Sequence, residues 1–219
     1  QTIETATNRL PLNEALQTRL SSDKKRFARQ AKNVGGTAGN PLVPKYIRKM
    51  CFEMRGFLNN PKYMEKEKLD IIRHSTSHIL AYAVKELFKD VKFGIGPTID
   101  DGFYYDFDLN GETFSLEDLD KIEQKMKEII KKNLEFNKKE VKIEEAENKL
   151  KDQPYKLELV EDLKNQGEKK VSFYQVGDFE DLCRGPHVSS TKELGNFKLL
   201  RVAGAYWKGE EERPMLTRI

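Results

Sequence analysis

The sequence predicts an α+β fold: an antiparallel sheet packed with one long helix and several shorter helices, preceded by a mostly helical or irregular basic segment. Three observations support this prediction. Short strand-like segments are interrupted by helical segments without the strand–helix–strand regularity of a parallel sheet. An apolar periodicity typical of a long helix begins at Tyr63. Residues 1–62 differ from the rest of the chain in composition and charge.

The composition narrows the class of protein. The chain has 219 residues, of which 37% are hydrophobic and 34% charged, as in a globular protein with a highly charged surface. Its two cysteines, Cys51 and Cys183, do not form a secreted disulfide framework, which favours a reducing compartment. No apolar run approaches the roughly 20 residues of a membrane span, and no signal-peptide pattern opens the chain. We therefore expect a cytoplasmic or organellar-matrix protein without a membrane partner.

Charge divides the chain near Pro61. Residues 1–60 contain 11 Lys and Arg against 4 Asp and Glu, whereas the remaining residues contain 28 against 32. A basic segment beside a mildly acidic domain favours a polyanionic partner, nucleic acid above all, although a solvated flank without a partner has the same charge pattern. The turn at Asn59-Asn60-Pro61 predicts two parts: a basic segment over residues 1–62, and a domain over residues 63–219.

The sequence before Lys89 is predicted to be mostly helical. Apolar spacing predicts short helices over residues 10–20 and 44–57, separated by a Gly-rich loop over residues 33–41. The long helix then starts at Tyr63, and its apolar positions follow one face as far as Phe88.

A hairpin and a capped helix come next. The turn Asp100-Asp101-Gly102 predicts a hairpin between strands over residues 91–99 and 103–109. Ser115 and Asp118 have the spacing of a capping box, which predicts a helix running to about residue 133. The remaining segments are predicted as strands over residues 136–141, 171–176, 197–207 and 214–219 and helices over residues 143–151 and 155–164.

All three histidines fall in two short motifs. His74 and His78 are four residues apart, so on a helix they share one face. Cys183 and His187 lie on a tight segment, because the Gly-Pro between them cannot continue a helix. Four such nitrogen and sulfur ligands suit a tetrahedral metal site, and neutral imidazoles equally suit metal-free hydrolysis. The spacing predicts one shared functional site and leaves metal binding or catalysis open.

Four blocks of sequence carry a family resemblance. They are His74 to Leu80, Gly96 to Asp108, Asp181 to Val188, and Ala203 to Ile219. In this order they resemble the editing domain of bacterial-type threonyl-tRNA synthetases, over roughly 150 residues. The related alanyl-tRNA editing proteins share both ligand pairs, but their second pair usually sits in Cys-Gly-Gly-Thr-His. The Cys-Arg-Gly-Pro-His of this sequence favours the threonyl branch.

The resemblance implies an editing deacylase that removes serine from Ser-tRNA(Thr) and spares Thr-tRNA(Thr). The implied partner is the 3′ CCA end of tRNA with its attached serine, while other RNA is a candidate partner for residues 1–60. The resemblance implies that the pocket is lined by His74, His78, Cys183 and His187. Lys156 matches a catalytic lysine of the family, and Asp181 and Tyr104 are implied to lie near the seryl group.

The resemblance also implies that no metal is required, since the threonyl editing domains are thought to work without one. If zinc is bound, its ligands are His74, His78, Cys183 and His187. No segment resembles an ATP-binding aminoacylation site, so we expect a ligase fragment or a separate editor that cannot charge tRNA by itself. Two alternatives stay open: a structural RNA-binding protein that reuses the editing fold, and an alanyl-type trans-editing deacylase.

Overall fold

The long helix predicted from Tyr63 is α3 (Pro61–Leu87), which begins two residues earlier than expected. Residues 75–84 of this helix are all buried, and they include every side of it. A helix that is buried all round must be enclosed by other elements. α3 is therefore the central element of the domain.

A computed structural model of the protein describes residues 61–219, with side chains from Glu65 onward. The helices expected over residues 10–20 and 44–57 and the basic segment that contains them lie outside the described residues. Within residues 61–219, no helix combines the length and the apolar character needed to cross a membrane.

The first sheet is antiparallel and has the strand order β1-β4-β9-β8. Its strands are β1 (Lys92–Phe93), β4 (Asp106–Asp108), β9 (Met215–Arg218) and β8 (Ala203–Tyr206). The predicted strand over residues 214–219 is therefore confirmed as β9, in the middle of this sheet. Pairing of β4 with β9 brings the end of the described chain beside residues more than a hundred positions earlier.

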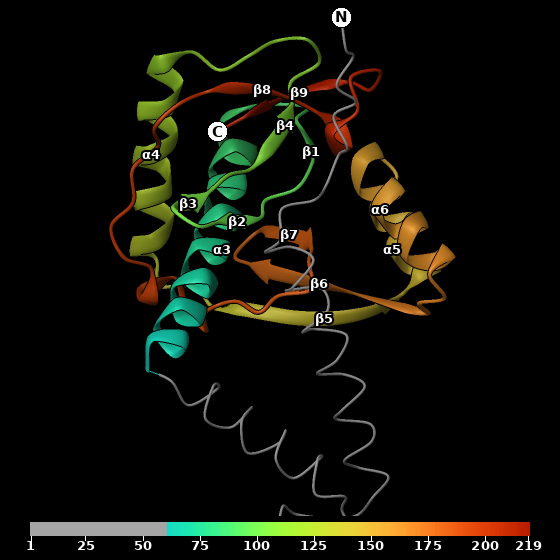
Figure 1. Cartoon of the computed structure of the whole chain (residues 1–219), viewed down its shortest axis with the longest axis horizontal. Coiled ribbons are helices and arrows are strands. Elements are labelled where there is room, and N and C mark those ends of the chain that lie inside the picture. The colour runs from blue at the N-terminus through green and yellow to red at the C-terminus, as the bar shows by residue number, and fades with distance from the viewer. Residues whose placement is uncertain (1–60) are drawn as a thin grey trace, which may run out of the picture. The chain divides into compact units, whose positions relative to one another are not determined.

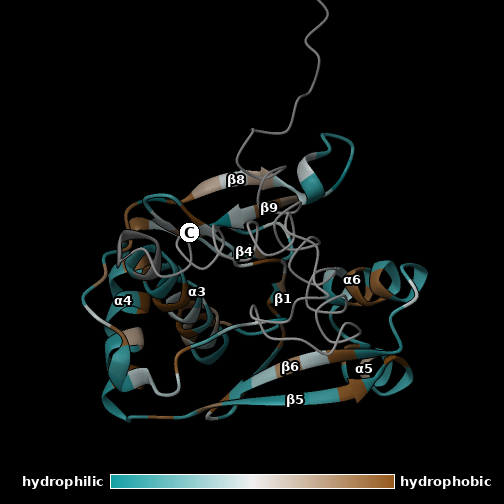
Figure 2. Cartoon of the chain, turned by 60° about the horizontal axis from the view of Figure 1, so that its bottom comes forward, coloured by the Kyte–Doolittle hydropathy of each residue, from teal (hydrophilic) through white to brown (hydrophobic). Residues whose placement is uncertain are grey.

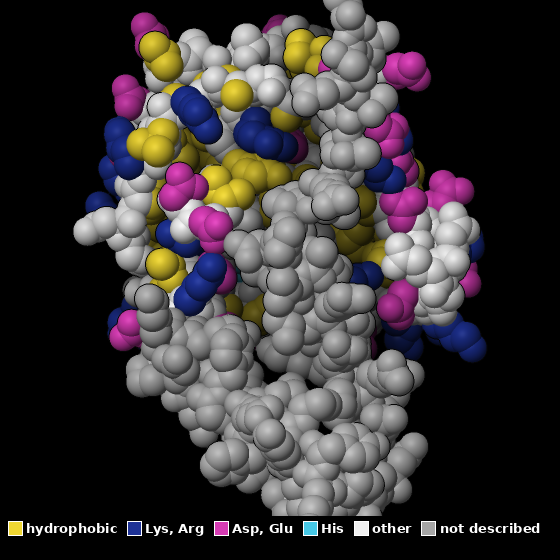
Figure 3. All heavy atoms as spheres, viewed as in Figure 1, with side chains coloured by type: hydrophobic (Ala, Val, Ile, Leu, Met, Phe, Trp, Pro, Cys, Tyr) yellow, Lys and Arg dark blue, Asp and Glu magenta, His cyan; other side chains and the backbone are white. Residues whose placement is uncertain are grey.

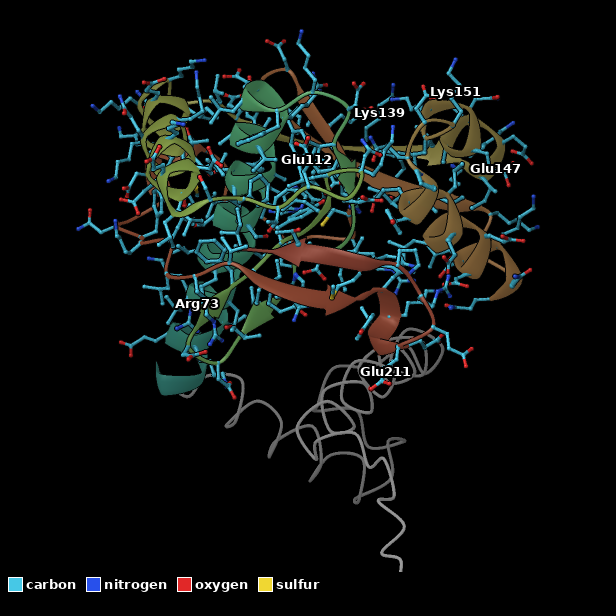
Figure 4. All side chains as sticks on the ribbon, turned by 90° about the horizontal axis from the view of Figure 1, so that it is seen from above. Arg73, Glu112, Lys139, Glu147, Lys151 and Glu211 are labelled. Atoms are coloured by element: carbon cyan, nitrogen blue, oxygen red, sulfur yellow. The ribbon has the colours of Figure 1, made fainter. Side chains whose placement is uncertain are left out.

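The predicted hairpin is present, but its strands are short. β2 (Thr98–Ile99) pairs antiparallel with β3 (Gly102–Phe103) around the expected turn. Arg73 of α3 donates hydrogen bonds to the carbonyl oxygens of Ile99 at 3.3 Å and Asp100 at 2.9 Å. Figure 4 labels Arg73 beside this hairpin, on the side of the domain away from Glu147 of α5. The hairpin is thus held to α3 by side-chain contacts as well as by its own ladder.

The second sheet is also antiparallel, with the order β5-β6-β7. β5 (Phe136–Lys142) and β6 (Lys170–Val176) confirm the predicted strands, whereas β7 (Phe179–Leu182) was not predicted. Most of β5 is hydrophilic in Figure 2, in agreement with the exposure of residues 137–140. The structure therefore contains two antiparallel sheets and a separate hairpin where the sequence predicted one sheet.

Three further helices complete the fold, and all three were predicted. α4 (Leu116–Lys131) begins with the expected capping box of Ser115 and Asp118. α5 (Ile143–Lys149) and α6 (Pro154–Asn165) follow β5 in the chain. In Figures 1 and 2, α4 lies beside α3, and α5 and α6 lie together on the opposite side of the sheets.

The predicted strand over residues 197–207 is wrong in its first half, because only residues 203–206 form a strand, β8. The Glu123 carboxylate of α4 accepts a hydrogen bond from the backbone N–H of Leu199 at 3.2 Å. It also forms an ion pair with Lys198 at 3.0 Å. A side chain here takes the place of a neighbouring strand. Leu199 is buried, whereas the adjacent Leu200 is 83% exposed.

Apolar side chains form three clusters. The largest joins α3 and α4 to both sheets, and the second joins α5 and α6 to the second sheet. The third contains Tyr155, Trp207 and Leu216, and so connects α6 to the first sheet. On the face shown in Figure 3, acidic and basic side chains of the described domain are interspersed. Both α3 and α6 therefore pack against the two sheets.

Candidate active site

α3 presents two of the three histidines, as predicted. His74 and His78 lie one turn apart, and their ring centroids are 5.2 Å from each other. Ser75, between them, donates its hydroxyl to the carbonyl oxygen of Ile71 at 2.8 Å. The same hydroxyl oxygen accepts the backbone N–H of Val188 at 3.0 Å. α3 thereby holds both histidines and the loop that faces them.

The loop after β7 supplies the thiol and the third histidine. Cys183 Sγ lies 3.3 Å from Nε2 of His74 and 3.3 Å from Nε2 of His187. Between them, Gly185 has a φ of 71°, in the left-handed region that favours glycine. A Cβ added there would clash with the hydroxyl oxygen of Tyr174, so the turn requires glycine on two grounds.

Aromatic rings and one hydrogen bond fix His187. Its imidazole stacks on Phe136 at a centroid distance of 5.1 Å, and Tyr174 meets it edge-on at 4.4 Å. Nδ1 of His187 lies 3.1 Å from the hydroxyl oxygen of Ser75. Because the only proton of that hydroxyl is already donated to Ile71, Nδ1 must be the donor. The lone pair of His187 Nε2 is thus left facing the thiol.

His74 adopts the same tautomer for the same kind of reason. Its Nδ1 lies 3.3 Å from the carbonyl oxygen of Pro186, which can only accept. Nε2 of His74 therefore also presents a lone pair to Cys183. A thiol has one proton and can donate to only one of the two nitrogens. At least one imidazole is left with a lone pair that can accept a proton from water or bind a metal ion.

A second, charged group of side chains lies beside the histidines. Lys156 Nζ is 2.6 Å from Asp181 Oδ1 and 2.9 Å from the hydroxyl oxygen of Tyr105. Tyr105 donates its hydroxyl to Asp181 Oδ2 at 2.6 Å. Lys156, Asp181 and Tyr105 are all buried. Each of the three side chains forms a hydrogen bond or ion pair with the other two. Such mutual contacts offset the cost of burying an ion pair inside a protein.

His78 connects the two groups. Its Nε2 lies 3.9 Å from Asp181 Oδ2, and its ring centroid is 4.3 Å from that of His187. His78 is 3% exposed, and within the described part of the chain its Nδ1 has no hydrogen-bond partner. The histidines, the thiol and the ion pair therefore form one continuous site.

Burial keeps the imidazoles neutral. It lowers the pKa of His74, and it lowers the pKa of His78 well below the usual value, with a further contribution from His74. Burial, followed by the neighbouring His78 and His74, lowers the pKa of His187 to about 2. All three rings are uncharged near pH 7, which is the form that accepts a proton or binds a metal.

Burial keeps the thiol and the phenol of the site protonated. It raises the pKa of the Cys183 thiol to about 11, despite the opposing hydrogen bond from the Gly185 N–H. Burial, together with the adjacent Asp181 carboxylate, raises the pKa of Tyr105 well above its usual value. The thiol is therefore a weak nucleophile at neutral pH, because the thiolate is the reactive form.

The sequence is similar to parts of known proteins. The sequence profile described as "Threonyl and Alanyl tRNA synthetase second additional domain" matches residues 171–219. A threonine--tRNA ligase of Clostridium botulinum strain Eklund 17B is 54% identical over 155 residues, which are 70% of this chain and 24% of the ligase. That of Thermotoga maritima is 52% identical over 157 residues, 71% of this chain and 24% of the ligase.

The chain carries the second additional domain of the threonyl-tRNA synthetase family. It spans about a quarter of the length of the ligases that it matches. A ligase from a second Clostridium botulinum strain is 54% identical over 191 residues, 84% of this chain and 29% of the ligase. This longer match includes residues before Pro61.

Two adjacent tyrosines, Tyr104 and Tyr105, make different contacts. Tyr104, implied near the seryl group, lies with its ring 3.7 Å from the guanidinium carbon of Arg218. The next residue, Tyr105, is the one that contacts Lys156 and Asp181. Sequence reasoning missed Tyr105, because two adjacent tyrosines give no sign of which one faces the site.

Ser75 was missed too, although its place between His74 and His78 was a usable signal. In this threonyl-tRNA synthetase domain it orients His187 and holds the loop through Val188. Serine in a helix often donates to the carbonyl oxygen of the residue four positions earlier, as Ser75 does to Ile71. Because this contact is common, the sequence does not reveal the second role of Ser75.

The donor set of this threonyl-tRNA synthetase domain fits a metal ion. The ligand atoms of His74, His78, Cys183 and His187 all lie within 4.8 Å of one another. Zinc takes four such nitrogen and sulfur ligands at about 2.0–2.3 Å. Hydrogen bonds from the Nδ1 atoms of His74 and His187 aim both Nε2 lone pairs inward, as in zinc sites. These four residues could therefore hold a metal ion.

Proposed function

We propose that this chain hydrolyses the ester that joins serine to the terminal ribose of threonine tRNA, and that it spares the threonyl ester. One observation carries the proposal: neutral imidazoles and a buried Lys156–Asp181 pair meet in one site, with His78 Nε2 3.9 Å from the Asp181 carboxylate. Ester hydrolysis needs a proton acceptor for water and a positive group for the developing oxyanion. The two halves of the site supply these groups separately.

The histidines are the proposed proton acceptors. His74 is less buried than His78, and its Nε2 presents a lone pair toward the centre of the cluster. Its lowered pKa keeps it neutral near pH 7. In this role His74 accepts a proton from the attacking water, directly or through a ribose hydroxyl.

Lys156 is the proposed electrostatic group. An ammonium has three N–H donors, and the contacts to Asp181 and Tyr105 use two of them. The third is left for the ester oxygen or the terminal ribose. Asp181 holds the ammonium in place and is a candidate acceptor for the amine or hydroxyl of the seryl group.

Water, not Cys183, is the proposed nucleophile. A thiol whose pKa is raised to about 11 carries almost no thiolate at pH 7. We propose that the reaction needs no metal. If zinc is bound by His74, His78, Cys183 and His187, it supplies Lewis-acid character to the same site.

The biological need is one of selectivity. Serine lacks one methyl group of threonine, and a site built for threonine discriminates against such a difference by only about 10–200-fold. A second site too tight for the extra methyl group rejects threonine by exclusion. We propose that this site acts on the 3′ CCA end, in the cytoplasm or an organellar matrix, as part of a synthetase or as a separate editor. Other RNA is the proposed partner of residues 1–60.

The decisive experiment measures deacylation of Ser-tRNA(Thr), Thr-tRNA(Thr) and Ser-tRNA(Ala) by the chain, with and without a chelator. We expect release of serine from Ser-tRNA(Thr) alone, and no effect of the chelator. Activity on Ser-tRNA(Ala) instead identifies an alanyl-type editor. RNA binding without any cleavage identifies a structural RNA-binding protein. Loss of activity with the chelator, together with stoichiometric zinc, makes the metal essential.

A further inference from the structure

Two polar side chains at the start of α6 reach the first sheet. The side chain of Gln153, the residue before the helix, accepts the backbone N–H of Phe93 at 2.8 Å and donates to the carbonyl oxygen of Val91, just before β1, at 3.2 Å. Tyr155 donates its hydroxyl to Asp108 Oδ2 at 2.6 Å. Both residues lie just before Lys156 in the sequence, and their contacts attach the start of the helix to β1 and to the end of β4.

Glu158, one turn further, makes a denser set of contacts. Its carboxylate accepts hydrogen bonds from Trp207 Nε1 at 2.9 Å and Arg213 Nη2 at 2.6 Å. Lys208 Nζ lies 2.6 Å from its other oxygen. All three donors belong to the short segment between β8 and β9, and the Trp207 ring is buried. This Trp207–Arg213 segment is part of the fourth sequence block, to which the proposed reaction assigns no role.

The two sides of α6 face different parts of the domain. Tyr155 and Glu158 are three residues apart and lie on one face, which contacts the first sheet and the Trp207–Arg213 segment. Lys156 and Val160 are four residues apart and lie on the adjacent face, and Val160 belongs to the core of the second sheet. A roll of the helix about its axis would have to break the Glu158 contacts.

Lys156 depends on that orientation. Its Nζ must reach Asp181 of the second sheet at 2.6 Å and Tyr105, just before β4 of the first sheet, at 2.9 Å. A small roll or tilt of a helix moves the tip of a long side chain further than its backbone. Misplacement of a reacting group by about 1 Å can cost about 100-fold in rate.

We propose that Glu158 is a positioning residue, which sets the place of Lys156 in the site by fixing α6 to the Trp207–Arg213 segment. Only the expected effect of Glu158 on the deacylation rate rests on the proposed function. The expected effect of Glu158 on the position of Lys156 is testable without any substrate.

The test uses the full chain with Glu158→Ala and Glu158→Gln, each alone and combined with Lys156→Ala. Lys164→Gln is the matched control, because Lys164 lies on the same helix but pairs with Glu147 of α5, at 2.8 Å, and not with the Trp207–Arg213 segment. Glu147→Gln is a second control on the neighbouring α5, where Figure 4 shows Glu147 at the outside of the domain. Circular dichroism confirms that each variant is folded; Glu158→Gln keeps the size of the side chain should Glu158→Ala fail to fold.

The first readout is the Nζ resonance of Lys156 in the ¹⁵N-labelled chain, assigned by its loss in Lys156→Ala. We expect the Glu158 variants to shift this resonance and to speed its proton exchange with water, and both controls to leave it unchanged. An unchanged resonance in a folded Glu158 variant overturns the inference, whatever the activity of the chain.

The second readout is single-turnover deacylation of Ser-tRNA(Thr). We expect Glu158→Ala to lower the rate constant by about 10-fold or more, and to have no further effect when Lys156 is already alanine. An equal loss in the Lys156→Ala background shows that Glu158 does not act through Lys156. If the unmodified chain cleaves no ester, the proposed function fails, and the resonance still decides the role of Glu158.

Discussion

The histidine–cysteine half and the Lys156 half of the site are built in opposite ways. His74 with His78, and Cys183 with His187, come from two five-residue motifs, and their groups are neutral. The other half joins Lys156 to Tyr105 across 51 positions of sequence, and Tyr105 to Asp181 across 76. Short motifs supply the neutral half as two pairs, which then meet across 109 positions between His74 and Cys183. The charged half has no such local pairs, and only the folding of α6, β7 and the segment before β4 assembles it.

This difference has energetic consequences. A neutral imidazole can lose its neighbour and stay neutral, because burial already keeps its pKa low. A buried carboxylate without its lysine is an uncompensated charge, which is costly inside a protein. We therefore expect substitutions in the charged half to affect folding and rate together, and those in the neutral half to affect mainly rate.

The largest effect is expected from Lys156→Met. It leaves the Asp181 carboxylate buried beside only a hydroxyl donor, and should lower the free energy of unfolding by about 3–5 kcal/mol. Loss of the oxyanion-stabilising charge should lower the deacylation rate constant by about 1,000-fold. Urea unfolding and single-turnover kinetics measure the two effects.

The matched control for Lys156→Met is its combination with Asp181→Asn, which removes the unpaired charge. We expect this double variant to recover most of the stability and none of the rate. Recovery of neither would show that the ion pair is needed for the packing of α6 and not only for charge balance.

His74→Ala tests the neutral half. Removing the proton acceptor should lower the rate constant by about 100-fold. Because His74 is only half-buried and leaves no charge unpaired, the free energy of unfolding should change by less than about 1 kcal/mol. A loss of stability as large as that of Lys156→Met would contradict the division of the site into two halves.

The pH dependence of the rate sharpens the same comparison. The pKa of His74 is lowered by burial, so the ring stays neutral below its ordinary value of 6.5. The rate of enzymatic deacylation, corrected for spontaneous hydrolysis, should therefore hold from pH 7.5 to 6.5 and decline only at lower pH. A decline centred at 6.5 or above would show that the acting imidazole is not buried as the structure describes.

The smallest effect is expected from Cys183→Ser. The thiol is protonated at neutral pH and acts only as a neighbour of two imidazoles, a place that a hydroxyl can also fill. Because the sulfur is not the nucleophile, the rate constant should fall by no more than about threefold. Complete loss of activity with a folded Cys183→Ser variant would favour a covalent or metal-dependent mechanism.

The elements that the sequence predicted are those with a strong local signal. The periodicity of α3, the Asp-Gly turn of β2 and β3, and the capping box at Ser115 are all confirmed. β7 was missed because its four residues, Phe179–Leu182, are too few to show alternation clearly. Residues 197–202 are rich in apolar residues, but a carboxylate of α4 takes the place of the neighbouring strand.

The site follows the same rule. The clustering of His74, His78, Cys183 and His187 could be predicted from spacing, since each pair is held by one helix or one turn. Lys156 and Asp181 could be named only through a family resemblance, because one lysine among many carries no local mark. Tyr105 could not be distinguished from Tyr104 before the contacts were known.

The register of β6 and β7 has a consequence for how this chain can vary. Asp181 lies opposite Tyr174, and the backbone N–H of Cys183 continues the pairing at Ser172. Alternate residues of a strand face opposite sides. One residue inserted in the turn at Gly177 would thus replace the aspartate and the cysteine together, with Glu180 and Leu182 in their places. The length of this turn is therefore under the same constraint as the reactive groups themselves.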